Sequence, residues 1–152
     1  MNKSIKNVLN ELLVDTFNEI LTIEQMALKS GRLNDLSATE IHTIEAIGMY
    51  IPRAMSEVAN DLGITVGTLS TAINNLVKKG YVERKRDEKD RRVVKITLTK
   101  KGKLAYRVHE KFHSDMIKET IKGLSEEEEK VLAGALGKLN EFFKIKYNIK
   151  KR

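Results

Sequence analysis

Small hydrogen-bonding side chains gather in one short segment of the chain. The segment holds three threonines, a serine, an asparagine and a glycine: Thr65, Gly67, Thr68, Ser70, Thr71 and Asn74. Hydroxyl groups can contact DNA bases or phosphates, and an asparagine amide can bridge N6 and N7 of adenine. Glycine leaves room for a close approach. We predict that these residues face the major groove of DNA; the alternative is the polar solvent face of an ordinary helix.

A strongly basic segment follows between residues 84 and 95. Seven basic residues stand against three acidic ones there, so the local excess is +4 within a net charge of +7. The narrow minor groove of DNA concentrates negative potential and attracts an inserted arginine. We predict DNA contacts from Arg86, Asp90, Arg91 and Arg92, with the Asp90 carboxylate pairing with Arg92 to hold that side chain extended. The alternative is a charged hairpin that contacts only solvent.

The residue types that catalysis needs are largely missing. The sequence has no cysteine, no glycine-rich phosphate loop and no His-Glu-x-x-His motif, which excludes thiol chemistry and disulfides. His113, Ser114 and Asp115 are consecutive on a predicted helix and so point in different directions. No apolar run approaches the roughly 20 residues of a membrane-spanning helix. We expect a cytoplasmic protein that is not an enzyme and has no membrane partner.

Periodicity and capping residues predict the elements that position these groups. Six amphipathic helices are expected, at about 4–29, 37–48, 54–61, 65–80, 99–123 and 125–143. A tight turn at Gly63 joins the third helix to the fourth. Alternating apolar residues predict strands 81–85 and 93–98 around a polar turn, and the lysine-rich tail 144–152 is expected to fray or to stay solvated. The fold class is mainly α with a small β-hairpin wing (α+β), a winged helix-turn-helix.

The terminal helices carry apolar faces that have no obvious partner within so short a chain. Two copies packing these helices together would bury that surface, so we predict a homodimer. In a helix-turn-helix the second helix lies in the major groove. Two copies would therefore read a pseudo-palindromic stretch of double-stranded DNA.

The winged-helix region also resembles a known family. Residues 54–102, AMSEVANDLGITVGTLSTAINNLVKKGYVERKRDEKDRRVVKITLTKKG, are similar to the MarR family of bacterial regulators. The Asp90-Arg91-Arg92 motif and the following Leu98-Thr99-Lys100-Lys101-Gly102 carry the resemblance. It implies one domain over 1–152, with a DNA-binding part at about 37–99 and dimerisation helices at about 4–30 and 100–146. It also implies that Arg92 enters the minor groove.

Further motifs resemble the FabT group within that family. They are Ile-Glu at 23–24, Glu-Ile-His-Thr-Ile-Glu at 40–45, Val-Gly-Thr-Leu-Ser-Thr at 66–71 and the segment 109–113. This resemblance implies a repressor of fatty-acid biosynthesis genes, with acyl carrier protein as co-repressor. The peroxide-sensing branch of the family relies on a reactive cysteine, which this sequence lacks.

Histidine spacing leaves a metal-responsive alternative open. His109 and His113 are four residues apart and therefore share one face of a helix. With Glu24 and His42 they resemble the primary site of the zinc-sensing branch, which implies a four-coordinate zinc shell. The alternative is a hydrogen-bonded histidine cluster, and no cofactor is required for the fold. A remoter alternative to DNA binding is a winged helix used only for protein contacts, which predicts an apolar helix or a neutral wing.

Overall fold

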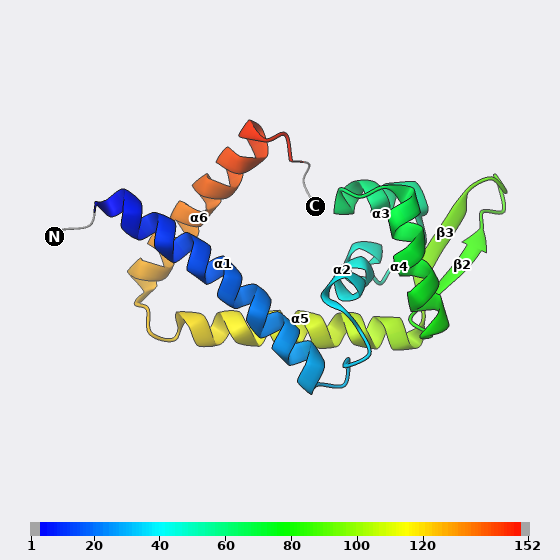
Figure 1. The fold of residues 1–152 in the computed structure, drawn as a ribbon, viewed down its shortest axis with the longest axis horizontal. Coiled ribbons are helices and arrows are strands. Elements are labelled where there is room, and N and C mark those ends of the chain that lie inside the picture. The colour runs from blue at the N-terminus through cyan, green and yellow to red at the C-terminus, as the bar shows by residue number, and fades with distance from the viewer. Residues whose placement is uncertain (1–3, 150–152) are drawn as a thin grey trace. The chain divides into compact units, whose positions relative to one another are not determined.

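The computed structural model describes residues 4–149. Its elements follow one another as α1 (Ile5–Ser30), α2 (Ala38–Ile47), β1 (Arg53–Ala54), α3 (Met55–Leu62), α4 (Val66–Lys78), β2 (Val82–Arg86), β3 (Val94–Leu98), α5 (Lys100–Ile121) and α6 (Glu126–Lys146) (Figure 1). The predicted mainly helical fold with a β-hairpin wing is confirmed. None of the helices within 4–149 is long and apolar enough to cross a membrane. The chain divides into two compact units, and the division falls between His42 and Thr43 inside α2.

The first unit consists of α1 and the start of α2. Ser4 caps α1, its side chain accepting a hydrogen bond from the backbone N–H of Asn7. The predicted capping box at α2 is present: Ser37 N donates to Glu40 Oε2 at 2.8 Å, and Glu40 N donates to Ser37 Oγ at 3.2 Å. Much of the apolar stripe of α1 remains exposed, with Phe17 62% accessible.

The second unit contains the helix-turn-helix, the sheet and the two C-terminal helices. Apolar side chains with at most 4% of their surface accessible form its core: Ile44, Ile47, Val58, Leu69, Ile73, Leu76, Val82, Ile96 and Leu98. They come from α2, α3, α4, β2 and β3, so each of these elements is anchored by at least one buried side chain. Each such side chain stabilises the folded state by about 1.5–3 kcal/mol relative to leaving it exposed to water. The predicted inward face of α4, at steps of four and three, is confirmed.

Three antiparallel strands make up the sheet, in the order β1-β3-β2. Strand β2 pairs with β3 from Val82 opposite Leu98 to Arg86 opposite Val94. Strand β1 pairs its two residues with Ile96 and Lys95. The sequence predicted only the β2–β3 hairpin, because a two-residue strand is too short to have an alternating pattern.

The end of α6 agrees with the bound of 146 expected for the C-terminal helices. The helix continues to Lys146, so the first three residues of the lysine-rich tail are helical, and residues 145–149 are exposed, as predicted for a solvated segment. Lysines near a helix C-terminus interact favourably with the negative end of the helix dipole, which supports this last turn. The end of the predicted tail, residues 150–152, lies outside the described residues.

A tight junction joins Gly80 and Tyr81, which follow α4, to the start of α5. Thr99 N donates to the Tyr81 carbonyl at 3.0 Å, and Thr99 Oγ1 donates to the Gly80 carbonyl at 2.6 Å. The Lys101 ammonium lies 4.3 Å from the centre of the Tyr81 ring, a favourable cation–π distance. A Cβ atom on Gly102 would overlap the Tyr81 carbonyl oxygen, so only glycine allows α5 to approach this closely.

Candidate nucleic-acid interface

Helix α4 begins with a threonine cap that uses two of the predicted DNA-reading residues. Thr65 is extended, with φ −73° and ψ 154°, and its Oγ1 accepts a hydrogen bond from Thr68 N at 3.1 Å. The hydroxyls of Thr65 and Thr68 lie 2.9 Å apart. Gly63, at φ 67°, supplies the left-handed turn that ends α3, and α4 begins three residues later at Val66. The cap fixes the N-terminus of α4, where the positive end of the helix dipole favours anions.

The outward face of α4 carries most of the predicted contact residues. Gly67, Thr71 and Asn74 follow one another at steps of four and three and are exposed. Thr65 and Thr68 are exposed at the first turn, whereas Ser70 is half-buried. The inward Leu69, Ile73 and Leu76 hold this face in place. The structure therefore brings five of the six residues to the surface, four of them at the cap and first two turns of α4 and Asn74 one turn further on.

The wing places its arginines by specific contacts. Asp90 Oδ1 accepts hydrogen bonds from Arg92 N and Nε, each at 3.1 Å, and Asp90 Oδ2 accepts one from Arg92 Nη2 at 3.3 Å. The side-chain bond from Arg92, followed by the backbone bond, holds the pKa of Asp90 below its ordinary value. The predicted Asp90–Arg92 pair is confirmed. The Arg92 side chain remains 91% accessible, so it projects while its direction is fixed.

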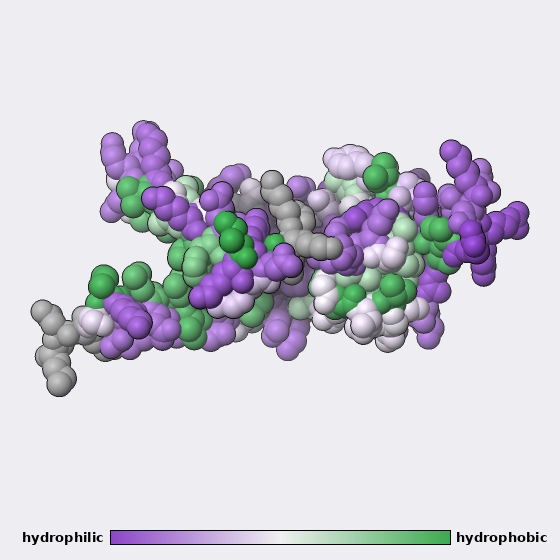
Figure 2. Space-filling model, turned by 90° about the horizontal axis from the view of Figure 1, so that it is seen from above, coloured by the Kyte–Doolittle hydropathy of each residue, from purple (hydrophilic) through white to green (hydrophobic). Residues whose placement is uncertain are grey.

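Arg86 and Arg91 are tied to each other at the same turn. Arg86 Nη1 donates to the Arg91 carbonyl at 2.9 Å, and Asp90 N donates to Asp87 Oδ2 at 3.3 Å. Arg86 therefore braces the turn between β2 and β3, while the Arg91 side chain is exposed. Figure 2 shows the hydrophilic side chains, in purple, gathered over the projecting hairpin.

Arg84 is a residue that the predicted set missed. Its Nη2 donates to the Oδ1 atom of Asn74, which links β2 to the reading helix, and the two elements pack side by side (Figure 1). The sequence placed Arg84 in the basic segment but gave no sign of its partner, because the two residues are ten positions apart on different elements. A local pattern of helix or strand periodicity does not extend over that distance.

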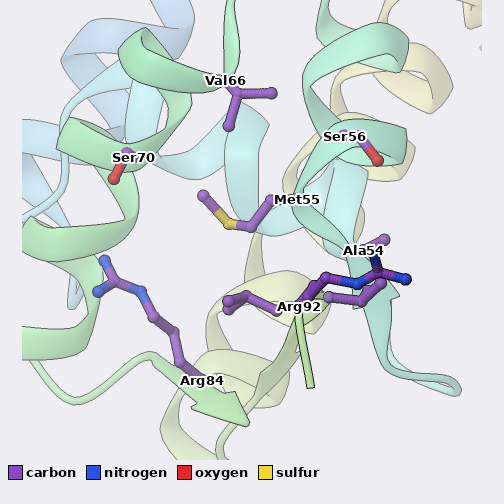
Figure 3. Close-up of a pocket in the computed structure, with 9 residues that line it drawn as sticks. Ala54, Met55, Ser56, Val66, Ser70, Arg84 and Arg92 are labelled. Carbon is purple, nitrogen blue, oxygen red and sulfur yellow. The ribbon is translucent and has the colours of Figure 1, made fainter. Parts of the chain in front are cut away.

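A cleft of about 440 Å³ lies between the reading helix and the wing. Its walls are apolar side chains interrupted by two hydroxyls and two guanidinium groups: Ala54, Met55, Val66, Val93, Val94, Ser56, Ser70, Arg84 and Arg92. Figure 3 shows Met55 between Val66 and Ser70 on one side and Ser56 and Ala54 on the other. Ser70 thus faces this cleft, which explains why it is half-buried.

The predicted metal-ligand residues form two pairs, one in each unit. In the first unit, His42 Nε2 lies 2.8 Å from the Glu24 carboxylate. In the second, the Nε2 atoms of His109 and His113 are 2.9 Å apart, and His109 Nε2 lies 3.3 Å from Glu45 Oε1. Glu45 is a neighbour of the histidine pair that the sequence did not predict.

The fold is a winged helix-turn-helix, formed by α3, the Gly63 turn, α4 and the β2–β3 hairpin. In this class of protein the second helix of the motif reads DNA. The chain belongs to the MarR family. A model of the MarR family matches residues 34–93. The uncharacterized HTH-type transcriptional regulator YwaE of Bacillus subtilis is 34% identical over 118 residues, which are 77% of this chain and 67% of YwaE. The protein is thus a transcriptional regulator of MarR type.

Solved structures agree with this assignment. The structure of Streptococcus pneumoniae FabT in complex with DNA is similar at 44% identity and a TM-score of 0.87, covering 91% of this chain and 97% of that one. Staphylococcus aureus MepR has the same fold, with a TM-score of 0.73 at 21% identity over 88% of this chain and 97% of its own. The family match and the transcriptional regulator YwaE confirm the prediction that the chain is not an enzyme.

Proposed function

We propose that this protein is a homodimeric, cytoplasmic repressor that binds the operators of fatty-acid biosynthesis genes, with acyl carrier protein as co-repressor. The observation that carries the proposal is the exposed polar face of α4 beside a wing whose Arg92 is held extended by Asp90. The likeness to FabT, at 44% identity, supports the choice of target genes. The proposed co-repressor follows from the same likeness.

In this proposal α4 enters the major groove and the wing lies over the adjacent minor groove. Gly67 lets the backbone approach the bases, while Thr68, Thr71 and Asn74 supply hydrogen-bonding groups. The guanidinium of Arg92 enters the minor groove, where it needs no further ordering because Asp90 already holds it. The remaining lysines and arginines of the wing attract phosphates without regard to sequence.

The proposed dimer uses apolar helix faces that the single chain leaves exposed. On α6, Val131, Leu136 and Phe142 have 72%, 50% and 51% of their surface accessible. On α1, Leu12 and Phe17 have 57% and 62% accessible. Exposed faces of this kind are typical of protein interfaces. Two copies of one chain would bury them by symmetric packing and present two reading helices to successive major grooves, about 34 Å apart.

Fluorescence anisotropy on a palindromic duplex from a fatty-acid-gene promoter tests the proposal. We expect binding that tightens when long-chain acyl carrier protein is added, and log affinity that falls linearly with log salt concentration. Unacylated carrier protein is the matched control. An operator affinity that acylated carrier protein does not change would refute its role as co-repressor. An affinity that does not depend on salt concentration would favour a winged helix used for protein contacts.

The histidine pair favours zinc as an alternative effector. We propose in that case that His109 and His113 supply imidazole ligands, since their Nε2 atoms face each other at 2.9 Å and zinc is commonly bound through such nitrogens. Zinc would act as a cross-link within α5, bound through the Nε2 lone pairs of both imidazole rings. Adding zinc to chelator-treated protein should then raise operator affinity, and His113→Asn should abolish that rise. An operator affinity unaffected by zinc would leave the pair as a hydrogen-bonded cluster.

A further inference from the structure

Asn74 on the reading helix is already engaged by a residue of the wing. Its Oδ1 atom accepts a hydrogen bond from Arg84 Nη2, although both side chains are exposed to solvent. A guanidinium group has only donors, so the oxygen of the Asn74 amide must face Arg84 and the NH₂ group must face away. The contact therefore fixes which end of the amide is free to meet another molecule.

The backbones that carry these two residues are both anchored in the core. Ile73 and Leu76, on either side of Asn74 in sequence, are completely buried. Arg84 lies opposite Ile96 in the β2–β3 ladder, and Val82, two residues earlier on the strand, is 2% accessible. Side chains projecting from rigid elements keep their geometry better than those on loops. Figure 3 shows the Arg84 side chain extending from β2 toward the helix that carries Ser70.

The Asn74–Arg84 pair consequently presents donors. The Asn74 NH₂ group and the remaining N–H groups of Arg84 can all donate, whereas the only acceptor oxygen of the pair is turned toward Arg84 and already accepts one hydrogen bond from it. In the major groove guanine offers two acceptors, N7 and O6, while adenine offers the acceptor N7 and the donor N6–H₂. A free asparagine matches adenine because it can both donate and accept. An asparagine held by Arg84 matches guanine better.

We infer that Arg84 is a specificity-determining residue that turns Asn74 from an adenine reader into a guanine reader. This inference rests on the proposed function, since it requires α4 to lie in the major groove. It also changes the expectation from the sequence, in which Asn74 alone bridges N6 and N7 of adenine.

Selection of bound duplexes from a library with randomised operator positions tests the inference. The base pair that faces Asn74 is the one whose preference is lost in Asn74→Ala. At that base pair we expect the wild-type protein to prefer guanine over adenine by about tenfold. Arg84→Met keeps most of the side-chain length but removes every donor, which frees Asn74 Oδ1, so the preference should move to adenine.

Lys85→Met is the matched control. It removes the same charge from the next residue of β2, whose side chain points to the other face of the strand by alternation. Both variants should bind all sequences more weakly, since each loses one cation near the phosphates. Only Arg84→Met should change the preferred base, and both should unfold at the wild-type temperature because Arg84 and Lys85 are exposed.

The possible results separate the inference from the proposed function. If the wild-type protein selects no sequence at all, sequence-specific DNA binding is wrong and the inference falls with it. If it selects an operator but Arg84→Met keeps the wild-type base at the Asn74 position, the proposed function stands and the role of Arg84 is refuted. A wild-type preference for adenine at that position would refute it equally.

Discussion

Gly102→Ala should destabilise the protein strongly although it adds a single methyl group. The new Cβ would overlap the Tyr81 carbonyl oxygen and come within 3.1 Å of Leu98 Cβ. Restoring an ordinary carbon–oxygen contact of about 3.3 Å requires α5 to move by about 1 Å. That shift would strain the hydrogen bonds from Thr99 N to Tyr81 O, 3.0 Å, and from Thr99 Oγ1 to Gly80 O, 2.6 Å.

The cost has two parts. Inserting a methyl group into a close-packed contact costs about 1–3 kcal/mol, and each weakened hydrogen bond costs about 0.5–1.5 kcal/mol. Together they predict a loss of about 3 kcal/mol in the free energy of unfolding, equivalent to a fall of about 10 °C in Tm. Urea and thermal unfolding of both proteins at one protein concentration measure this loss, since the stability of a dimer depends on concentration.

Gly67→Ala is the matched control for the same substitution. A Cβ on Gly67 meets nothing closer than Thr65 Oγ1 at 3.9 Å, and alanine favours a helix over glycine by up to about 1 kcal/mol. Gly67→Ala should therefore unfold at or above the wild-type temperature, while its methyl group weakens operator binding. If Gly102→Ala is as stable as Gly67→Ala, the α5 junction does not require glycine at position 102.

Three further outcomes are expected. Arg92→Ala should weaken operator binding by about 10- to 100-fold in anisotropy titrations without changing Tm, because the side chain is 91% accessible; an unchanged affinity would contradict its minor-groove role. Ile73→Ala, at a completely buried position, should lower the free energy of unfolding by about 2–5 kcal/mol in urea titrations. Backbone and then side-chain hydrogen bonds from Ser125 hold the pKa of Glu128 below its ordinary 4.5. The contribution of this capping box to the free energy of unfolding is therefore present at neutral pH and is lost as the pH falls through the lowered pKa of Glu128. Ser125→Ala should raise the Glu128 pKa part of the way back toward its ordinary value, as measured by NMR titration.

Features set by neighbouring residues could be predicted from the sequence. The Ser37–Glu40 and Ser125–Glu128 capping boxes, the Thr65 cap and the Gly63 turn each depend on contacts within four residues of the chain. Their chemistry is visible as a residue type at a fixed spacing. The Asp90–Arg92 pair belongs to the same group, because its two members are two residues apart.

Features set by distant residues could not be predicted in the same way. Strand β1 exists because Arg53 and Ala54 pair with Ile96 and Lys95, more than forty positions later. The Arg53 guanidinium donates to the Ala46 carbonyl at 2.7 Å and pairs with Asp61 at 2.7 Å, so one side chain links the end of α2 to α3. Nothing in the residues around Arg53 indicates these partners, which only the tertiary fold brings together.

The wing depends both on local residue spacing and on contacts between residues that are distant in the sequence. Its charge excess could be read from the sequence and predicts a polyanionic partner, but charge alone treats every arginine there as equivalent. The contacts distinguish them: Arg86 braces the turn, Arg92 is aimed by Asp90, and Arg84 holds Asn74. Salt-dependent attraction depends on the number of cations, whereas discrimination between bases depends on donors held in a fixed direction. Substitutions that preserve charge but break these contacts, such as Arg84→Lys, should therefore reduce sequence discrimination more than total affinity.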